Sequence, residues 1–545
     1  MAGRDDDGGP GDRQDESFAT LADPAAWPAA LEQPADSPIQ RVDTHAAAVF
    51  LGERHVLKIK RAVRFSFLDF TTADRRRAVC EAELRLNRRT APEIYLRIGA
   101  IVRRGGGLAL LDDAAAAGDD QIVDWLVVMR RFDEDGLLAD VAKSGRLTDA
   151  ICDEVARQVA ALHRAEAPRR DLGGVPALQR TLDGALGEIH AHDDGGILDA
   201  EQVAAAEEAL RAAFEAAREG IEARRRDGFV RHVHGDLHLG NICLFGGQPR
   251  LFDCIEFNEE FAVIDILYDL AFLLMDLWHA GRPAQANRVL NFWLEDLHDM
   301  PGRLDGLSLL PLYLALRAAI RTHVHCSMAA VQQDAAAARS QAETAQAYLA
   351  ELAAFLAPAQ PVLLGIGGLS GTGKSTLARR LAPLLGRIPG AVVLRSDAIR
   401  KAMWGVAPTE KLPPEAYAAG QSEAVYAELR RQAAAGLRAG QAVIADAVHA
   451  RAEERAALEA VARDCGTAFH GLWLDAPDSE LEDRLAARRG DVSDADSAVL
   501  HRQRGYDIGP LDWSRVATGG GIDAAVAAVA DALPGGWLRV APGMA

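Results

Sequence analysis

The sequence predicts two domains of different fold class, an α+β domain followed by an α/β domain built on a parallel sheet. Strand-like segments dominate residues 38–129, and helical patterns dominate residues 148–357 apart from a strand–loop–strand stretch at 230–257. From residue 362 onward, apolar strands alternate with helical stretches, which is typical of a parallel sheet with helices on both faces. The sequence Ala-Pro-Ala-Gln-Pro at 357–361 separates the two patterns, and we place the domain boundary there because proline stops a helix.

The expected elements follow in order along the chain. Residues 1–16 are rich in Asp and Gly and are expected to form a disordered tail, residues 17–357 form the first domain, and residues 358–545 form the second. The first domain opens with a five-stranded lobe that includes a charged helix at 72–90. Its expected strands are two within 38–60, joined at 52–54, and three near 94–102, 108–111 and 122–129. Strands of the second domain are expected at 362–367, 391–395, 442–446 and 469–474.

Composition limits the classes of protein to which this chain can belong. Lys and Arg number 60 against 79 Asp and Glu, a net charge of −19, and such an acidic surface repels nucleic-acid backbones. The six cysteines are scattered without a Cys-x-x-Cys pair, which argues against a disulfide framework or a zinc site. No apolar run is long enough to span a bilayer, and the acidic N-terminus is the opposite of a signal peptide. We therefore expect a cytoplasmic protein that binds neither nucleic acid nor membranes.

A complete phosphate-binding loop begins at Gly368. Residues 368–376 read GLSGTGKST and match G-x-x-x-x-G-K-[S/T] between an apolar strand and a helix, which is the context that the motif requires. Glycines let consecutive backbone N–H groups point at a phosphate, and the helix N-terminus adds its positive end. Lys374 is expected to bridge the β- and γ-phosphates of ATP, and Ser375 is expected to hold Mg²⁺. The nucleotide-binding residues predicted on this basis are Gly368, Gly371, Thr372, Gly373, Lys374, Ser375 and Thr376.

Other segments of the second domain carry groups suited to phosphoryl transfer. Asp397 follows an apolar strand and is placed to accept the proton of a hydroxyl group, while Arg400 is placed to contact an anionic substrate. Asp446 ends the next strand, where we expect a water-mediated contact with Mg²⁺. Arg484 and Arg488 precede an acidic loop and predict a lid whose arginines close over the transferring phosphate. An ordinary salt-bridged helix is the alternative reading of that last segment.

The second domain resembles the small P-loop kinases, a group that includes gluconate kinases, chloramphenicol phosphotransferases, zeta toxins and polynucleotide kinases. The resemblance covers residues 360–535 and rests on the phosphate loop together with Ser-Asp-x-x-Arg at 396–400. It implies transfer of a phosphoryl group from ATP to a hydroxyl, with Asp397 as the base and Arg400 as a substrate or phosphate contact. The acidic net charge makes a nucleic-acid end a poor acceptor.

A second constellation lies at residues 234–256 of the first domain. Asp236 and Asn241 occur in HGDLHLGN, and Asp253 follows twelve residues after Asn241 in RLFDCIEF. A carboxylate beside the acceptor hydroxyl, an amide oxygen five residues later and a second carboxylate at a strand end can supply a base and two Mg²⁺ ligands. The intervening stretch predicts a hairpin that turns at Gly246-Gly247 and returns Asp253 to Asn241.

This pattern resembles the aminoglycoside phosphotransferase and choline kinase branch of the protein-kinase-like fold. The motif of that family is His-x-Asp-x-x-x-x-Asn followed by Asp. The resemblance implies that Asp236 is the catalytic base and that Asn241 and Asp253 are Mg²⁺ ligands. Asp265 and Asp269 resemble the start of a structural helix in the family, so we expect no catalytic role for them.

The same resemblance implies a lysine that binds the α- and β-phosphates and pairs with a carboxylate on the charged helix. We take Lys58 and Glu81 as this pair. Lys60 lies on the same strand face as Lys58, and Glu83 lies on the same helix as Glu81, so spacing leaves both assignments open. Only six lysines occur in this arginine-rich chain, and Lys58, Lys60 and Lys374 are three of them. That distribution agrees with a need for a compact ammonium at these positions.

The turn expected to cover the phosphates, Asp43-Thr44-His45-Ala46, departs from the family pattern. The family sometimes carries glycines there, and this chain has none. We expect either a looser approach of the backbone to phosphate or a hydrogen bond from Thr44 in its place.

Nearly the whole chain beyond the tail resembles bacterial fusion proteins described as bifunctional aminoglycoside phosphotransferase/ATP-binding proteins. The likeness extends to the segments THAAAVFL, FLDFTTADRRR, ELRLNRR and SDAD. It implies an ATP- and Mg²⁺-dependent phosphotransferase that has two nucleotide sites and acts on hydroxyl groups of small molecules. The alternative is a P-loop kinase or ATPase that is regulated by a catalytically idle, kinase-like sensor domain. Kinship at the level of the fold does not fix the acceptor.

Overall fold

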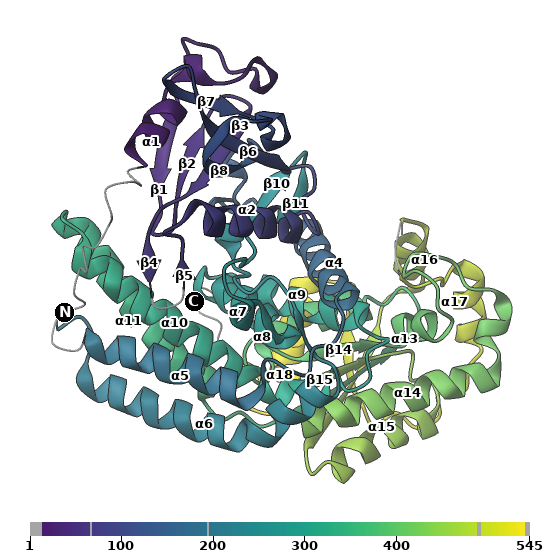
Figure 1. Cartoon of the computed structure of the whole chain (residues 1–545). Helices are drawn as coiled ribbons and strands as arrows, with labels where there is room; N and C mark the ends of the chain where they lie inside the picture. Colours follow the sequence, from purple (N-terminus) through teal and green to yellow (C-terminus); the bar gives the residue numbers. More distant parts are fainter. Residues whose placement is uncertain (1–13, 66–67, 193–195, 488–491, 540–545) are drawn as a thin grey trace. The chain divides into compact units, whose positions relative to one another are not determined.

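The computed structural model describes residues 14–65, 68–192, 196–487 and 492–539 (Figure 1). By the density of their internal contacts the residues divide into two compact units, each assembled from several stretches of chain. The first unit takes residues 1–147, 161–172 and 230–269, and the second takes 148–160, 173–229 and 270–545. The domain boundary expected at 357–361 lies inside the second unit, and it stays a prediction.

A six-stranded antiparallel sheet is the centre of the first unit. In spatial order its strands are β1 (Gln40–Asp43), β2 (Ala47–Leu51), β3 (His55–Lys60), β8 (Gln121–Arg130), β6 (Tyr95–Arg104) and β7 (Gly107–Leu111). The sequence predicts five strands here, and the sixth arises because the first expected strand, before residue 52, is divided into β1 and β2 by the turn at 44–46. All four residues of β1 are exposed, so the strand lacks the apolar alternation that reveals the others.

Apolar clusters cover both faces of this sheet. On one face, Leu57 belongs to a cluster that includes Leu21 of α1 (Asp15–Ala22). On the other face, Val56 belongs to a cluster that includes Cys80 of α2 (Ala73–Asn87). Successive residues of β3 therefore face opposite cores, as the two-residue period of a strand requires.

The beginning of the chain contributes to the first unit. Residues 1–13 of the expected tail lie outside the described residues, whereas residues 14–16 are part of the fold. The Gln14 amide donates to the carbonyl of Lys60 at 2.8 Å and to a carboxylate oxygen of Asp124 at 2.7 Å, and its own oxygen accepts from the backbone N–H of Ala62 at 2.6 Å. These bonds satisfy a buried amide and fix the start of α1 against the sheet.

The remaining pairs of strands in the first unit are short and antiparallel. They are β4 (Arg64–Phe65) with β5 (Leu68–Asp69), β9 (Val230–His232) with β12 (Val263–Asp265), and β10 (Ile242–Phe245) with β11 (Gln248–Leu251). The β10–β11 hairpin turns at Gly246-Gly247, as the sequence predicts. Both glycines have positive φ, which two-residue hairpin turns of this kind need. Two short helices, α3 (Leu138–Lys143) and α7 (Glu259–Ala262), complete this unit.

The second unit begins with helices. Within it, α5 (Gly174–Ala191), α6 (Ala200–Arg226), α10 (Leu310–Val331) and α11 (Ala335–Leu356) pack together (Figure 1). Two other helices, α4 (Asp149–Ala165) and α8 (Ile266–His279), have residues in both units. A further helix, α9 (Pro283–Asp296), and the 3-10 helix η7 (Asp305–Leu309) lie between α8 and α10 in the chain.

A five-stranded parallel sheet follows in the same unit. In spatial order its strands are β14 (Val392–Arg395), β15 (Val443–Asp446), β13 (Val362–Gly368), β16 (Ala468–Asp475) and β17 (Ser514–Ala517). Four of these agree with the expected strands, and the fifth, β17, is a short edge strand that the sequence pattern does not reveal. The predicted two-domain fold class, a kinase-like α+β fold and a parallel P-loop sheet, is confirmed.

Helices cover both faces of the parallel sheet. Leu364 and Ile366 of β13 pack in one cluster with α12 (Lys374–Leu381) and α18 (Ile522–Ala532). The opposite face carries α14 (Ala419–Arg438) and α15 (Ala452–Asp464). The other helices are α13 (Ser396–Met403), α16 (Asp478–Ala487) and α17 (Ser497–Arg504). Among the helices that the structure describes, none combines the length and the apolarity that a membrane crossing needs.

The outer edge of β14, which no other strand in the described part of the chain pairs with, is covered by one face of α9. Asn291 accepts from the N–H of Val393 at 2.7 Å and donates to the carbonyl of Ala391 at 3.1 Å, and one turn further Glu295 pairs with Arg395 at 2.6 Å. Positions four apart on a helix and positions two apart on a strand advance by similar distances. The polar stripe of α9 therefore matches the outward-facing groups of β14 step by step.

Candidate functional sites

Lys58 and Lys60 of β3 meet three carboxylates in the first unit. The Lys58 ammonium lies 2.7 Å from one oxygen of Glu83 and 2.5 Å from Asp253. The Lys60 ammonium lies 2.7 Å from the other oxygen of Glu83 and 2.5 Å from Glu256. Glu83 is fully buried, so a single carboxylate bridges both lysines away from water.

The structure corrects the expected partner of Lys58, which is Glu83 and not Glu81. Glu81 lies on the exposed face of α2 and pairs with Arg77 one turn earlier at 2.9 Å. Two residues correspond to roughly 200° around a helix, so only one of the two glutamates can face the sheet. Spacing along the chain identifies the two candidates, and the packing of α2 decides between them.

The charges in this cluster support one another. Burial by itself would raise the pKa of Glu83, but the two adjacent ammonium groups lower it to about 2. Burial would also lower the pKa of Lys58 and of Lys60, and the carboxylates around them raise both above the ordinary value. Glu256 differs, because burial raises its pKa in spite of Lys60. At neutral pH the two lysines and Glu83 are therefore all ionised.

Asp236 and Asn241 lie together in the loop after β9. The Asn241 amide donates to the backbone carbonyl of Asp236 and to a carboxylate oxygen of Asp236, both at 2.9 Å. The His238 ring lies 3.4 Å from the same carboxylate. Asn241 is the last residue of the 3-10 turn η6 (Leu239–Asn241). Its bonds to Asp236, five residues earlier, close the loop between them.

Buried Asp269 holds this loop in shape. Its carboxylate accepts from the backbone N–H of Gly235 at 2.8 Å and of His234 at 3.3 Å, and it lies 3.0 Å from the His163 ring. Gly235 has positive φ, and a Cβ there would lie 3.0 Å from a backbone carbonyl oxygen. Asp269 thus organises the backbone of the loop, in agreement with the structural part expected for it.

Asp253 adopts a backbone conformation that is uncommon for a residue with a side chain. Its φ is 61°, and its N–H donates to the Tyr95 hydroxyl at 3.2 Å. Residues with such strained backbone conformations occur often at active sites and ligand-binding sites, where the surrounding structure holds them in place. Here the consequence is the contact of Asp253 with Lys58, which the hairpin before it makes possible.

The turn between β1 and β2 is closed by Thr44. The N–H of Ala47 donates to the Thr44 hydroxyl at 3.0 Å, and the N–H of Thr44 donates to the carbonyl of Ala47 at 2.8 Å. The hydroxyl is therefore engaged within the turn itself.

In the second unit, the phosphate loop has the backbone that its sequence predicts. Gly368, Gly371 and Gly373 all have positive φ, of 137°, 89° and 89°. A Cβ on Gly368 would lie 2.7 Å from the carbonyl oxygen of Leu474. Glycine is therefore required at this position both by conformation and by space.

At the end of the loop, Ser375 contacts Asp446 of β15, and Lys374 acts on the same carboxylate through space. The Lys374 ammonium donates to the carbonyls of Gly368 and Leu369 at 2.8 and 2.9 Å, which folds it over the loop. The Ser375 hydroxyl donates to Asp446 at 2.6 Å. Burial raises the pKa of Asp446, and Lys374 and Ser375 lower it in part. The structure thus brings together the predicted residues Lys374, Ser375 and Asp446.

A cavity of about 220 Å³ opens beside the phosphate loop. Its walls include Thr372, Thr376 and Arg484 as well as Thr518 and Gly521. The Thr518 hydroxyl donates to the carbonyl of Thr372 at 3.0 Å, and Arg484 donates to the carbonyl of Thr518 at 2.8 Å. Sequence reasoning missed Thr518, although three consecutive glycines at 519–521 mark the loop. Arg488, expected to contact phosphate, lies outside the described residues.

Residues expected to contact the acceptor are carried by α13. Asp397 lies in the first turn of this helix. Arg400 is buried, donates to the carbonyl of Ala416 at 2.6 Å and lies over the Tyr417 ring at 4.9 Å. The predicted base and the predicted anion contact are thus one helical turn apart, beside an aromatic ring that the sequence did not single out.

Asp494 connects the expected lid loop to the residues around α13. Its carboxylate accepts from the Tyr417 hydroxyl at 2.8 Å and from the N–H of Leu412 at 2.9 Å, and it lies 3.0 Å from the Lys401 ammonium. Hydrogen bonds from these groups lower the pKa of Asp494 against the effect of burial. Lys401 is another of the six lysines, so the scarcity of lysine was the signal that could have identified it.

Comparison with known families agrees with these two sites. Residues 71–307 match the phosphotransferase enzyme family, and residues 363–506 match a family described as an AAA domain. The first match contains Glu83 and the loop at Asp236 but begins after Lys58 and Lys60, and the second contains the phosphate loop. The two matches together support a phosphotransferase with kinase-like and P-loop domains.

The chain belongs to the same family as Uncharacterized protein Rv2004c of Mycobacterium tuberculosis. The two are 31% identical over 479 residues, which cover 86% of this chain and 90% of that protein. Uncharacterized protein Mb2027c of Mycobacterium bovis matches with the same identity and coverage. The two-domain arrangement is therefore shared along nearly the whole of these relatives.

Solved structures resemble the two halves separately. A choline/ethanolamine kinase family protein from Mesorhizobium loti is 15% identical, covering 62% of this chain and 94% of its own, with a TM-score of 0.36. The APS kinase of Mycobacterium tuberculosis is 23% identical, covering 32% of this chain and 98% of its own, with a TM-score of 0.22.

Proposed function

We propose that the protein is an ATP- and Mg²⁺-dependent phosphotransferase with two nucleotide sites, each of which transfers a γ-phosphoryl group to a hydroxyl of a small molecule. One observation carries the proposal: in each unit a lysine ammonium converges with a carboxylate suited to Mg²⁺. In the first unit these are Lys58 and Asp253, in contact at 2.5 Å. In the second they are Lys374 and Asp446, with Ser375 bonded to the carboxylate.

In the first unit, the proposed roles follow the chemistry of each group. Lys58, held by Glu83, neutralises the α- and β-phosphates, and Asp236 accepts the proton of the attacking hydroxyl. Asn241 and Asp253 supply oxygen ligands to Mg²⁺. Bound Mg²⁺ supplies charge neutralisation for the phosphates.

The donor set fits magnesium better than a transition metal. Among the residues that the structure describes, no group of three or more His, Cys, Asp or Glu side chains is arranged to hold a metal ion. Magnesium in kinases is commonly held by one or two carboxylates and completed by phosphate oxygens and water. Asn241 with Asp253, and Ser375 with Asp446, meet that description with oxygen donors alone.

In the second unit, the backbone N–H groups of residues 368–376 cradle the phosphates, and the cavity beside Thr518 receives the nucleoside. Asp397 acts as the base and Arg400 contacts the acceptor or its phosphate. Thr372 and Thr376 line the nucleoside cavity. Arg488 remains a predicted phosphate contact.

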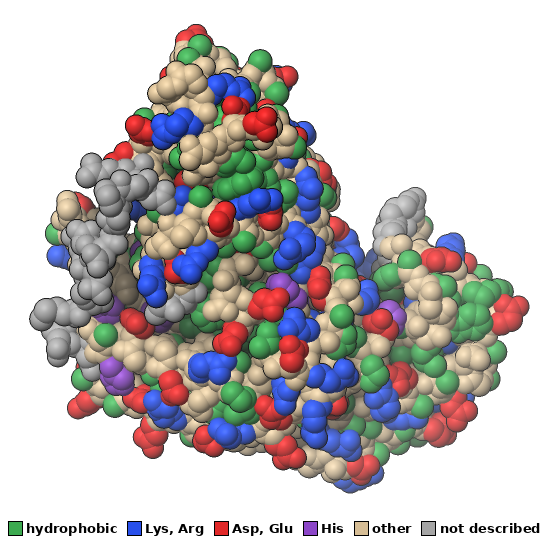
Figure 2. Space-filling view, in the orientation of Figure 1, with side chains coloured by type: hydrophobic (Ala, Val, Ile, Leu, Met, Phe, Trp, Pro, Cys, Tyr) green, Lys and Arg blue, Asp and Glu red, His purple; other side chains and the backbone are tan. Residues whose placement is uncertain are grey.

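The proposed acceptors are small molecules, and the proposed location is the cytoplasm. On the face shown in Figure 2, Lys and Arg side chains are interspersed with Asp and Glu and form no continuous basic stripe. Together with the net charge of −19, this distribution argues against a nucleic-acid acceptor.

The test is a screen of a metabolite library with ATP labelled on the γ-phosphate, using full-length chains. Asp236→Asn and Lys374→Ala are each compared with the wild type. Because the second compact unit takes residues from both sides of 357, point variants separate the sites better than a truncation does. Each variant is expected to lose one labelled product and keep the other. A wild-type chain that labels no hydroxyl compound, or variants that lose nothing, would contradict the proposal.

A second candidate function is supported by the turn at Thr44. The hydroxyl that was expected to substitute for glycine N–H groups is bonded to Ala47, which favours a first unit that binds nucleotide loosely and regulates the P-loop site. In that case Asp236→Asn changes no labelled product, while Glu83→Gln changes the rate at the other site.

A further inference from the structure

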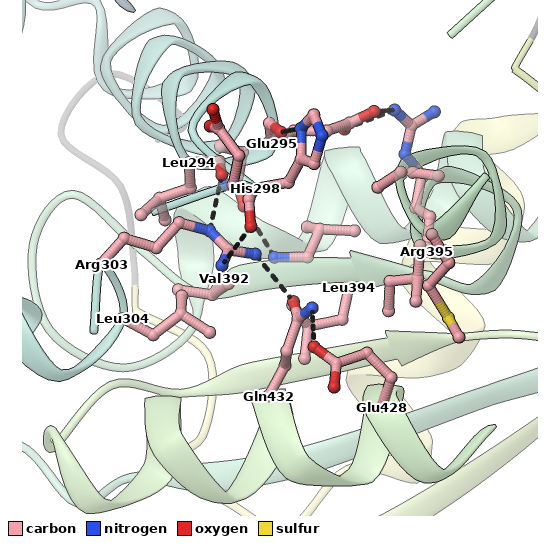
Figure 3. Close-up of a pocket in the computed structure, with 17 residues that line it drawn as sticks. Leu294, Glu295, His298, Arg303, Leu304, Val392, Leu394, Arg395, Glu428 and Gln432 are labelled. Carbon is pink, nitrogen blue, oxygen red and sulfur yellow. Dashed lines mark hydrogen bonds and ion pairs between the residues drawn. The ribbon is translucent and has the colours of Figure 1, made fainter. Parts of the chain in front are cut away.

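A cavity of about 380 Å³ lies in the second unit, and its lining includes none of the phosphate-loop residues 368–376 (Figure 3). Leu294 and Leu304 line it from α9 and the segment that follows, Leu394 and Ile399 line it from β14 and α13, and Gln432 lines it from α14. Its volume is within the range of small-molecule sites, and its walls combine apolar side chains with a few polar groups, as such sites do. The family segment of the phosphotransferase half and that of the P-loop half both contribute to the walls.

Helix α13 separates this cavity from the proposed acceptor site. Ala398 and Ala402, four residues apart, line the cavity. Asp397, Arg400 and Lys401 share the other face of the helix, as their spacing of three and four residues requires. The cavity is therefore distinct from the acceptor site, but the same two-turn helix, α13, forms part of the wall of each.

Most carboxylates on the cavity wall are already paired with arginine. Glu295 lies 2.6 Å from Arg395, and Glu428 lies 2.6 Å from Arg431. Asp299, the remaining carboxylate of the wall, is exposed. Glu428 and Asp299 act on the neighbouring Arg303 through space, without an ion-pair contact.

Arg303 is the exception among the charged groups of the wall. The residue as a whole is 7% exposed. Its guanidinium donates to the carbonyl of Leu294 at 2.9 Å, to the carbonyl of His298 at 3.3 Å and to the amide oxygen of Gln432 at 3.2 Å (Figure 3). All three acceptors are neutral. Among the described residues, no carboxylate is in ion-pair contact with Arg303. A buried cation with only neutral partners is costly, and an anion that reached it would be stabilised.

We propose that this cavity is an effector site for a small organic monoanion, with Arg303 as the anion contact and the apolar wall as the contact for the rest of the ligand. A guanidinium has five N–H donors, of which the three bonds above use three, so donors remain for a carboxylate or phosphate ester. Leu294, Leu304 and Ile399 favour an apolar body on the ligand. Burial lowers the pKa of Arg303 from its ordinary value, and Glu428 raises it in part, so the residue stays cationic.

Binding of the effector influences the acceptor site through helix α13. An occupant that packs against Ala398 and Ala402 orders the helix whose other face carries Asp397 and Arg400. It also contacts the wall formed by the pair of Glu295 and Arg395, at the end of the strand that leads into α13. This inference goes beyond the proposed function, and the binding step does not depend on the phosphotransferase activity.

The test is calorimetric titration of the full-length chain with 3-phenylpropionate and with its neutral isostere 3-phenylpropionamide, each up to about 10 mM. We expect one molecule of 3-phenylpropionate to bind per chain, at least about tenfold more tightly than 3-phenylpropionamide. The neutral amide cannot make the charge-assisted bond to the buried guanidinium. Hydrogen exchange of residues 396–403 is expected to slow when the carboxylate is bound. Absence of binding, or equal binding of the two probes, would overturn the proposal.

Two variants locate the site. Arg303→Gln is expected to abolish the preference for the carboxylate over the amide. Arg303 also bonds carbonyls at the end of α9, so the thermal transition of Arg303→Gln is measured to check that this variant is folded. If it is not, Ala402→Phe tests whether the probes bind in the cavity. That substitution fills the cavity and is expected to eliminate binding of both probes, whereas Ala456→Phe on the exposed face of α15 leaves it unchanged. Binding that survives Ala402→Phe would overturn the proposal.

Discussion

Replacement of Glu83 by glutamine tests the lysine cluster of the first unit most directly. Glu83 is fully buried and bridges Lys58 and Lys60 at 2.7 Å each. Glutamine keeps the shape but removes the charge, which leaves Glu256 and half-exposed Asp253 to neutralise both ammonium groups. Breaking a buried pair by removing one partner typically costs about 3–5 kcal/mol.

The pKa of Glu83 gives a second measure of the same effect. It lies at about 2 in the folded chain compared with an ordinary 4.5. Since a tenfold preference for the ionised form is worth about 1.4 kcal/mol, the difference corresponds to roughly 3 kcal/mol. The folded pKa is the lower one, so this stabilisation is complete above about pH 5 and is lost as the pH falls toward 2.

Hydrogen exchange in β3 and α2 is the appropriate assay, because a chain of two units need not unfold in one step. Glu83→Gln is expected to accelerate exchange in these elements about a hundredfold at pH 7. The control is Glu81→Gln, which breaks only an exposed pair with Arg77. That variant is expected to change exchange less than about threefold. Equal effects of the two substitutions, or a difference that persists near pH 2, would refute the reasoning.

Three further substitutions test other parts of the two sites. Asp269→Asn weakens the acceptor of the Gly235 N–H and is expected to cost about 2 kcal/mol of local stability. The loss is measured as faster hydrogen exchange in residues 234–241, together with reduced labelling of the product made at the Asp236 site. Gly368→Ala places a Cβ 2.7 Å from a carbonyl oxygen at positive φ and is expected to lower the thermal midpoint of the second unit, with a cost of about 1–3 kcal/mol. Thr518→Val removes a bond to the phosphate loop and is expected to weaken binding of a fluorescent ATP analogue by about fivefold, with little change in stability. An unchanged affinity would contradict the assignment of the nucleoside cavity.

The sequence was sufficient for sites that are continuous in the chain. The phosphate loop is one uninterrupted motif, so its glycines, Lys374 and Ser375 are recognised without any knowledge of packing. The loop from Asp236 to Asn241 and the hairpin that returns Asp253 are also local, because turn chemistry fixes them.

Contacts between distant segments were harder to predict. The choice between Glu81 and Glu83 depends on which face of α2 meets the sheet, and a helix with charges on all sides does not show that. Asp494 meets Lys401 only when the chain folds back between two helices. The separation of β1 from β2 and the short edge strand β17 were missed because neither β1 nor β17 alternates clearly between apolar and polar residues.

The stripe of α9 was missed for another reason. Asn287, Asn291 and Glu295 at four-residue intervals read as the solvated side of an amphipathic helix. In the structure they meet a strand, and the same polarity that suits water also suits unpaired backbone groups.

That contact links the segment that matches the phosphotransferase family to the parallel sheet of the P-loop segment. An outermost strand with bare N–H and C=O groups is a template for pairing with another molecule, and proteins must shield such strands. Here the shield for β14 is encoded before residue 300, well upstream of the strand itself. A P-loop segment without α9 would expose the backbone groups of β14 that Asn291 bonds. The structure therefore gives the polypeptide upstream of the P-loop segment a second part to play, which is to cover the outer strand of the parallel sheet.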